Sequence, residues 1–332
     1  MSQLLATFLR IKNAKNINKE ELLSEEKYIY QFEIDGKEKD FSIKNKSEDF
    51  FIQNHLIPTV KYYISVDGDT INDIEFYDKA DIEGIVIDYT PGVKNIKNFI
   101  KILLAPLGKT LYVFGGGWNI QDDNASFITK SIGTFPFWEK FYRSNNEKYS
   151  YKEDTYPKNG WNEYFYAGLD CTGYMGWAIY NLMNTKSGNE EGFVYPSTTF
   201  AKTLAKFNYG TWRKPISSDY KEIISSLNPG DIISIDGHVY AVVSTCTDGS
   251  AVIIHSTVSP SISGVKGGGV QLSAISANCD EDYSCKAYKM AKEYMEKNYS
   301  DWTKRYPVVI KPIAQYLDFS KGDTGIFSWF IE

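Results

Sequence analysis

The sequence predicts an α+β protein of two domains, in which a helix that carries a cysteine packs on an antiparallel sheet, after a small β-barrel-like domain. Three observations predict this class. An apolar helical pattern begins at Cys171. Residues 232–255 contain three apolar runs separated by turn residues, as antiparallel strands do. Residues 1–90 contain strand-like runs with Asp-Gly turns.

The first predicted domain covers residues 1–90. Residues 28–34 alternate between apolar and polar side chains, and an Asp-Gly pair follows them. Residues 61–76 contain two further runs around another Asp-Gly pair. Two hairpins with turns of this kind are typical of a small β-barrel.

The second predicted domain covers residues 91–332. Residues 96–104 form an apolar stripe with helical spacing. The segment 118–165 is rich in aromatic side chains and directly precedes the cysteine, so it is placed to wall or cover a cleft. A helical extension is expected over residues 284–298. Its apolar face holds Ala287, Met290, Ala291, Tyr294 and Met295.

Cys171 is expected at the N-terminus of its helix. Asp170 is suited to cap the N–H groups of the first turn. The helix dipole and these N–H groups favour a thiolate, the attacking form of cysteine, so Cys171 should be alkylated faster than Cys246. Cysteine is also often buried and inert in core helices, and this segment alone fits both interpretations.

Two of the three histidines fall on one predicted hairpin. His238 follows Gly237, which lets the backbone approach closely, and His255 lies on the returning strand. A two-residue turn at the intervening Asp-Gly pair would place His255 opposite Val242. Both histidines would then share a sheet face, about 13 Å apart. The rings can touch only if the turn is wider or a bulge shifts the register.

Four segments resemble, in order, the motifs of the NlpC-type (NlpC/P-sixty) cell-wall cysteine peptidases, a branch of the papain-like fold. They are a tyrosine–aromatic–glycine motif at 111–116, Asp-Cys-Thr-Gly at 170–173, Pro-Gly-Asp with Gly-His-Val within 229–239, and a third-residue strand at 254–256. The resemblance covers residues 95–275. The chain departs from the family in a threonine for serine after the cysteine, in a long insert before it, and in a wider gap between the histidines.

The resemblance implies a papain-like catalytic domain with a Cys-His-His triad. Cys171 would be the nucleophile, His238 the general base and acid, and His255 the group that orients and stabilises His238. Independent chemistry agrees, because a cysteine needs a neighbouring base, histidine ionises near neutral pH, and the base needs a third group to fix its tautomer. The backbone N–H of Cys171 is a natural oxyanion donor.

The resemblance also implies which residues line the substrate cleft. Tyr112, Asp170 and Thr172 take these positions in the family pattern, and Gly237 is placed beside them. Tyr112 is alternatively a packing residue of the cleft wall. The β-rich first domain would serve for substrate targeting or as a packing partner.

The implied activity is hydrolysis of an amide bond in peptidoglycan stem peptides, usually between γ-D-glutamate and a diamino acid. Peptidoglycan or muropeptides are the expected partners, and no cofactor is expected. An acyl transferase on the same fold is an alternative, because an amine can capture a thioester as well as water can. A wall-binding module with a vestigial site is another.

Several single residues also allow other interpretations. The triad residues could bind zinc, but no close-spaced Cys-x-x-Cys or His-x-x-x-His pair supports a metal site. His55 is expected to be a loop or strand-end residue without a catalytic role. Cys279 and Cys285 flank an acidic loop and could close a small disulfide, whereas Cys246 is expected to be a buried thiol. The triglycine run 267–269 predicts a flexible loop that borders the site.

Composition narrows the class of partner. The formal net charge of −6 gives no indication of nucleic acid or of an anionic membrane surface. No apolar run approaches the ~20 residues that a membrane span needs. The first residues lack the basic start and cleavage site of a signal peptide. Either the protein stays inside the cell or a signal has been removed, and the resemblance favours an extracellular or wall-associated protein. The sequence leaves the oligomeric state open.

Overall fold

The computed structural model describes residues 27–34, 37–44, 89–117, 129–130, 132–145, 167–183, 192–260, 262, 264, 266–277 and 283–331. The chain divides into two compact units, residues 1–86 and 87–332.

In the first unit the described residues form one antiparallel hairpin, β1 (Lys27–Ile34) and β2 (Lys37–Lys44). Ile34 pairs with Lys37, so the hairpin encloses two residues, the Asp-Gly pair. This confirms the first predicted hairpin. The second predicted hairpin, around Asp67, lies outside the described residues, and the barrel stays a prediction.

The second unit is built on a six-stranded sheet in the order β3-β8-β4-β5-β6-β7, whose paired neighbours are all antiparallel. With its helices, this sheet confirms the predicted α+β class. The strands are β3 (Gly210–Arg213), β8 (Gly325–Trp329), β4 (Ile232–Ile235), β5 (His238–Thr245), β6 (Ser250–Pro260) and β7 (Lys266–Ser276).

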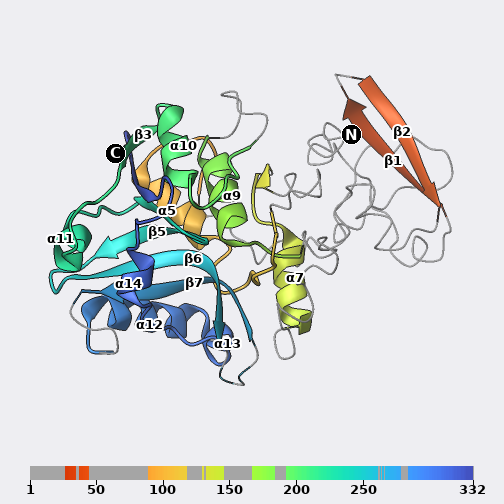
Figure 1. The fold of residues 1–332 in the computed structure, drawn as a ribbon. Coiled ribbons are helices and arrows are strands. Elements are labelled where there is room, and N and C mark those ends of the chain that lie inside the picture. Colours follow the sequence, from red (N-terminus) through yellow and green to blue (C-terminus); the bar gives the residue numbers. More distant parts are fainter. Residues whose placement is uncertain are drawn as a thin grey trace. The chain divides into compact units, whose positions relative to one another are not determined.

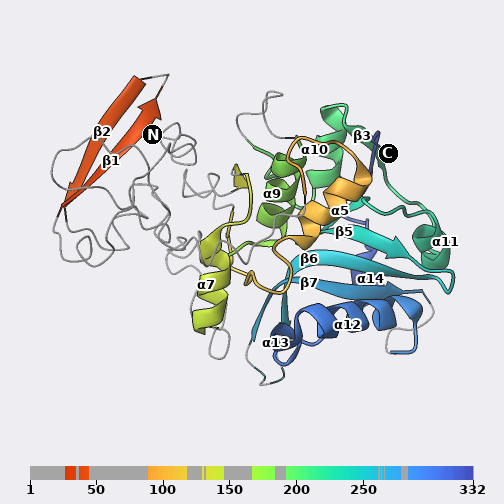
Figure 2. The ribbon, with the colours of Figure 1, turned by 180° about the vertical axis from the view of Figure 1, so that it is seen from behind.

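Helices cover both faces of this sheet (Figures 1 and 2). On one face α9 (Cys171–Met183) packs against β5, β6 and α5 (Ile96–Leu104). On the other face α14 (Ile313–Tyr316) lies against the strands, while α12 (Lys286–Asn298) runs beside β6 and β7. The other helices are α7 (Pro136–Asn145), α10 (Phe200–Lys206), α11 (Tyr220–Ser225) and α13 (Ser300–Thr303).

The cysteine-bearing helix α9 is buried on nearly all sides. All of its residues except Tyr180 are buried. Its glycines allow this, because a Cβ on Gly173 would overlap the carbonyl oxygen of Gly116, and one on Gly176 would lie 2.5 Å from a methyl group of Val194. The predicted helix is therefore present, but it is a core helix rather than one with a single apolar face.

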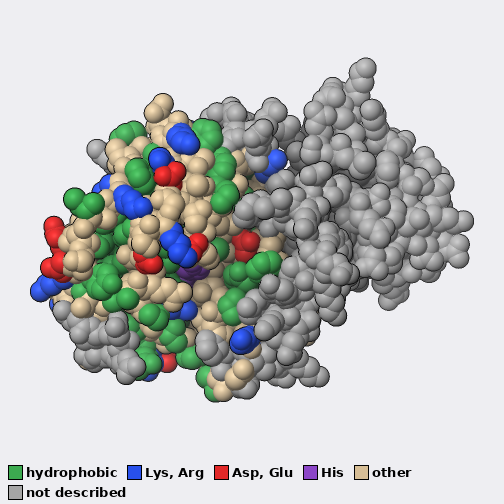
Figure 3. All heavy atoms as spheres, in the orientation of Figure 1, with side chains coloured by type: hydrophobic (Ala, Val, Ile, Leu, Met, Phe, Trp, Pro, Cys, Tyr) green, Lys and Arg blue, Asp and Glu red, His purple; other side chains and the backbone are tan. Residues whose placement is uncertain are grey.

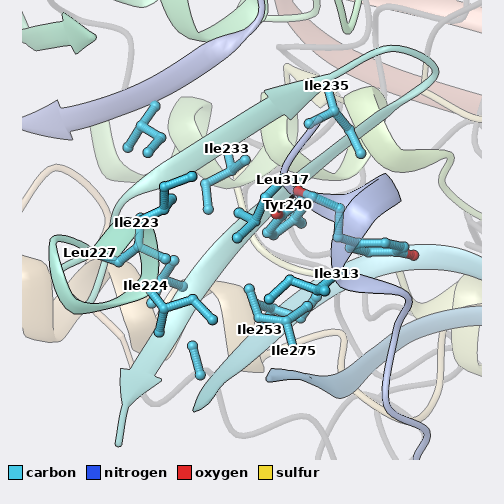
Figure 4. Close-up of a cluster of buried hydrophobic side chains, with 14 of the residues drawn as sticks. Ile223, Ile224, Leu227, Ile233, Ile235, Tyr240, Ile253, Ile275, Ile313 and Leu317 are labelled. Carbon is cyan, nitrogen blue, oxygen red and sulfur yellow. Dashed lines mark hydrogen bonds between the residues drawn. The ribbon is translucent and has the colours of Figure 1, made fainter. Parts of the chain in front are cut away.

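A hydrophobic cluster on the α14 side holds β4, β5, β6, β7 and β8 against α11 and α14 (Figure 4). Alternate strand residues point into it, as a pleated sheet requires. Its labelled members are Ile223, Ile224, Leu227, Ile233, Ile235, Tyr240, Ile253, Ile275, Ile313 and Leu317.

The triglycine run is not the predicted flexible loop. It lies inside β7, where Gly269 pairs with Thr257 and Gly267 with Ser259. A Cβ on Gly269 would overlap the carbonyl oxygen of Thr110, which comes from a neighbouring segment. The glycines are thus explained by close backbone approach to a strand rather than by mobility.

The predicted C-terminal helix is present as α12, with a narrower buried face than expected. Ala287, Ala291 and Met295 are buried, whereas Met290 and Tyr294 are exposed. Within the described residues, no helix is long and apolar enough to span a membrane.

Two cysteines differ from what the sequence predicts, one in its burial and the other in its pairing. Cys246 is half-buried rather than buried, with its sulfur 3.7 Å from that of Met290. Cys285 is a free buried thiol, and its suggested disulfide partner Cys279 lies outside the described residues.

Candidate active site

The turn before α9 fixes the start of the helix at Cys171. One carboxyl oxygen of Asp170 accepts hydrogen bonds from the Gly173 N–H at 2.6 Å and from the Thr172 hydroxyl at 3.0 Å. This is an N-cap, as predicted. Thr172 is 3% exposed, so its hydroxyl serves the cap.

Two distant segments hold this turn in place. The Leu169 carbonyl accepts a hydrogen bond from the Ser256 hydroxyl of β6 at 2.6 Å. The Asp170 N–H donates to the Gly116 carbonyl at 2.8 Å. The segment that ends at Gly116 also carries Tyr112, whose N–H donates to Gly268 of β7 at 2.8 Å. The predicted opening motif therefore lies between β7 and the cysteine turn.

The Cys171 thiol sits beside the backbone on either side of His238. Its sulfur lies 4.0 Å from the carbonyl oxygen of Gly237, and the Val239 N–H also interacts with it. Burial, followed by the charge of Asp170, raises the pKa of the Cys171 thiol to about 12. Burial therefore outweighs the helix terminus that was expected to favour a thiolate, and the resting thiol needs a base.

Burial also raises the pKa of the Asp170 carboxyl to about 7, against the hydrogen bonds from Gly173, Thr172 and Gly115. The side chain is only 8% exposed. Its oxygens are engaged by the turn, and its predicted contact with substrate stays a prediction.

His238 and His255 meet directly, with Nε2 of His238 2.8 Å from Nδ1 of His255. On the far side, Nε2 of His255 lies 2.9 Å from the Ser273 hydroxyl oxygen. If each ring donates from Nε2, this chain leaves the lone pair of His238 Nδ1 available as a base. That tautomer is the one a general base requires.

Burial keeps both imidazoles uncharged. It lowers the pKa of His238 to about 3, with a further lowering by Lys311. It also lowers the pKa of His255, with smaller contributions from His238 and Lys311. His255 has no exposed surface and His238 is half-buried, so access to the pair is through His238. Figure 3 shows a small area of histidine surface near basic and acidic side chains.

The strand register explains how the two rings meet. The turn contains three residues, since the Cys246 N–H donates to the Ser250 carbonyl, and its last residue, Gly249, has φ +79°. A bulge between Val242 and Ser244 shifts the pairing again, so Ala241 pairs with Ile254. Together they move His255 two residues closer to His238 than a two-residue turn would. Both devices considered from the sequence are present.

Position 237 requires glycine because of its backbone conformation rather than because of close packing. It has φ +75° in the two-residue turn between β4 and β5, and an added Cβ would meet nothing within 4 Å. The positive φ, rather than a lack of room for a side chain, therefore accounts for glycine at this position. Its N–H donates to the Ser197 hydroxyl at 3.1 Å.

Two residues of the C-terminal part join the site without a sequence signal. The Tyr316 ring lies 5.5 Å from that of His238 and 5.9 Å from that of His255, between centroids. Burial raises the pKa of Tyr316, and the charge of Cys171 adds to this, which connects the thiol to the same cluster. Lys311 is 8% exposed and interacts with the Tyr316 ring at 5.8 Å. A tyrosine among 25 and a lysine outside any motif could not be singled out.

Among the residues that the structure describes, no group of three or more His, Cys, Asp or Glu side chains could hold a metal ion. His55 and most of the 118–165 insert lie outside those residues. Trp138, in the described part of the insert, is buried with its ring 5.7 Å from that of Trp177 in α9.

Comparison with known proteins gave no match to a family model, a curated protein or a solved structure.

Proposed function

We propose that this protein is a papain-like cysteine peptidase that hydrolyses an amide bond in peptidoglycan stem peptides. The observation that carries the proposal is the 2.8 Å contact between His238 and His255 beside a helix that begins at Cys171. A pair of histidines in contact, next to a cysteine at a helix terminus, is the arrangement that nucleophilic catalysis needs.

In the first half-reaction, His238 takes the thiol proton as the sulfur of Cys171 attacks the amide carbonyl carbon. The C–S bond forms while the carbonyl π electrons move to oxygen, and the Cys171 N–H donates to that oxyanion. The intermediate then collapses, the C–N bond breaks, and the leaving amine takes the proton from His238. A thioester on Cys171 remains.

In the second half-reaction, His238 takes a proton from water as its oxygen attacks the thioester carbon. Collapse breaks the C–S bond and releases the carboxylic acid, and the proton returns to the sulfur. His255 fixes the orientation of His238 and disperses the charge that it gains in both steps.

The substrate class rests on the ordered motifs of the NlpC-type peptidases. By that resemblance the scissile bond joins γ-D-glutamate to a diamino acid, and Tyr112, Asp170, Thr172 and Gly237 contact the substrate. The same resemblance places the protein at the cell wall or outside the cell. The backbone hydrogen bonds from Leu169 to Leu111 and from Asp170 to Gly116 support Tyr112 as a residue of the same site.

The test is incubation of the full chain with defined muropeptides, followed by mass spectrometry. We expect two new fragments whose masses sum to the substrate plus one water. Cys171→Ala should form none, while Cys246→Ala, which removes a half-buried thiol elsewhere, should behave like the wild type. An amine-containing adduct would indicate a transferase, and binding without products would leave only a wall-binding module.

A further inference from the structure

One aromatic side chain of α14 contacts both histidines of the pair. Tyr316, the last residue of α14, is buried with 6% of its surface exposed. Its ring centroid lies 5.5 Å from that of His238, with the ring planes at 67°. The centroid of His255 lies 5.9 Å away, with the planes at 70°. The phenol ring therefore packs edge-to-face against both partners of the 2.8 Å hydrogen bond.

The position of Tyr316 is fixed through its backbone and through its ring. The hydroxyl of Tyr240, two residues after His238 on β5, donates a hydrogen bond to the backbone carbonyl of Tyr316. The Tyr316 N–H donates to the Pro312 carbonyl at 3.0 Å, within the turn that forms α14. The rings of Tyr240 and Tyr316 also lie 5.4 Å apart, between centroids. Tyr316 cannot turn away from the histidines without breaking these contacts.

The ring of Tyr240 has a different place in the site. It stacks on His238, with centroids 5.9 Å apart and planes at 28°. In the part of the chain that the structure describes, Tyr316 is the aromatic residue outside the pair whose ring contacts both imidazoles. Its place thus differs from that of an ordinary neighbour of one histidine.

The hydrogen bond between the imidazoles needs protection from water. Burial keeps both rings uncharged, so this is a bond between neutral groups, and water competes effectively with such bonds. His255 has no exposed surface, whereas His238 is half-buried and accessible to water. A largely apolar ring beside the bond excludes water and lowers the local dielectric constant, which strengthens the bond.

We propose that Tyr316 is a positioning residue that acts through the histidines, because its ring excludes water from the bond between His238 and His255 and holds the two imidazoles in contact. The ring rather than the hydroxyl has this role, since the ring is the part that contacts both. The inference rests on the proposed function, in which His255 orients His238 to take the thiol proton.

The test follows the proton shared by the pair, by NMR of the ring N–H groups in the full chain with isotope-labelled histidine and no substrate. The chain has only three histidines, and His55→Gln assigns the third. In Tyr316→Leu, which removes the aromatic ring, the shared proton should exchange with water at least ~10-fold faster than in the wild type. Tyr316→Phe keeps the ring and should protect the proton as the wild type does.

Two controls separate this effect from a general loss of packing. Leu317→Ala truncates a buried side chain of the hydrophobic cluster beside Tyr316 and leaves the ring in place, so the shared proton should stay protected. Tyr294→Leu removes an exposed tyrosine of α12 and should have no effect. If Tyr316→Leu protects the proton fully, or if Leu317→Ala exposes it equally, the proposal is wrong.

The wild-type chain supplies a test that does not depend on the folding of any variant. Its shared proton should be visible and in slow exchange. Nuclear Overhauser contacts should join the Tyr316 ring protons to carbon-bound protons of both imidazoles. A shared proton that exchanges too fast to be seen, or contacts to only one imidazole, would overturn the proposal.

The kinetic readout keeps this inference separate from the proposed function. Because Tyr316 acts on the base rather than on the substrate, Tyr316→Leu should lower kcat roughly 10- to 100-fold and leave KM within about twofold. A chain that cleaves no muropeptide but exposes the proton in Tyr316→Leu would keep the role of Tyr316 in holding the pair and remove the peptidase. Wild-type kcat in a Tyr316→Leu chain whose shared proton is exposed would leave the peptidase and remove the positioning role.

Discussion

At the scale of the residue, burial decides the ionisation of the site. Cys171, His238 and His255 are all neutral at pH 7, because burial raises the pKa of the thiol and lowers those of the imidazoles. The site therefore rests as a thiol and an imidazole rather than as an ion pair. Proton transfer must accompany attack on the substrate.

The buried thiol reverses the alkylation order that the sequence predicted. Cys171 is 8% exposed with a pKa raised to about 12, whereas Cys246 is half-buried. Iodoacetamide should therefore modify Cys246 before Cys171 in the resting protein at neutral pH. Peptide mapping over a time course checks this, and faster labelling of Cys171 would show that an ion pair forms after all.

Asp170 should make stability depend on pH. Its folded-state pKa of about 7 lies above the ordinary value, so the folded protein binds the proton more tightly. Stability should fall as pH rises from ~4 to ~7, by at most about 4 kcal/mol. Asp170→Asn keeps a cap and removes the titration, so its free energy of unfolding should be flatter over this range. Equal pH slopes in denaturant titrations of the two proteins would contradict this.

At the scale of the element, the sheet face that a strand residue takes and the register between paired strands have different origins. Alternation and turn residues predict which strands exist and which side each residue takes, because that period is local. Register depends on the αL residue Gly249 and on the bulge after Val242, which only the partner strand defines. The sequence could therefore place both histidines on one face without showing that they touch.

Gly269 of β7 and Gly237 of the site should respond differently to substitution by alanine. Gly269→Ala forces a Cβ against the Thr110 backbone and should destabilise the protein by more than about 3 kcal/mol. In Gly237→Ala the added Cβ meets no atom within 4 Å, so only the positive φ destabilises the variant, by about 1 kcal/mol. Thermal unfolding of the two variants checks the order. Equal losses would mean that the close approach at β7 is not rigid.

At the scale of the whole molecule, the site is assembled from parts far apart in the chain. The motifs supply Cys171 and the histidines, but Tyr316 and Lys311 come from the C-terminal part. No local pattern marks them, because only the packing of the C-terminal segment on the sheet brings them to the site. The hydrophobic cluster of Figure 4 likewise joins α11 and α14 to five strands of the second unit.

Residues 87–332 should therefore fold alone, because the sheet, its helices and this cluster all lie within that unit. Denaturant unfolding followed by circular dichroism should give one cooperative transition for the truncated chain. Ile253→Ala in that chain should cost about 2 to 5 kcal/mol, since Ile253 is fully buried in the cluster. A truncated chain without a cooperative transition would show that residues 1–86 contribute to its core.

The central claim is that Cys171, His238 and His255 act as one catalytic unit, and the initial rate of muropeptide hydrolysis per folded molecule tests it most directly. Cys171→Ala and His238→Ala should each lose at least ~10³-fold, because members of a unit are not additive. His255→Ala should lose less, His255→Asn should retain part of the rate, and His55→Ala should match the wild type. A near wild-type rate in Cys171→Ala, or equal rates in His255→Ala and His55→Ala, would contradict the account.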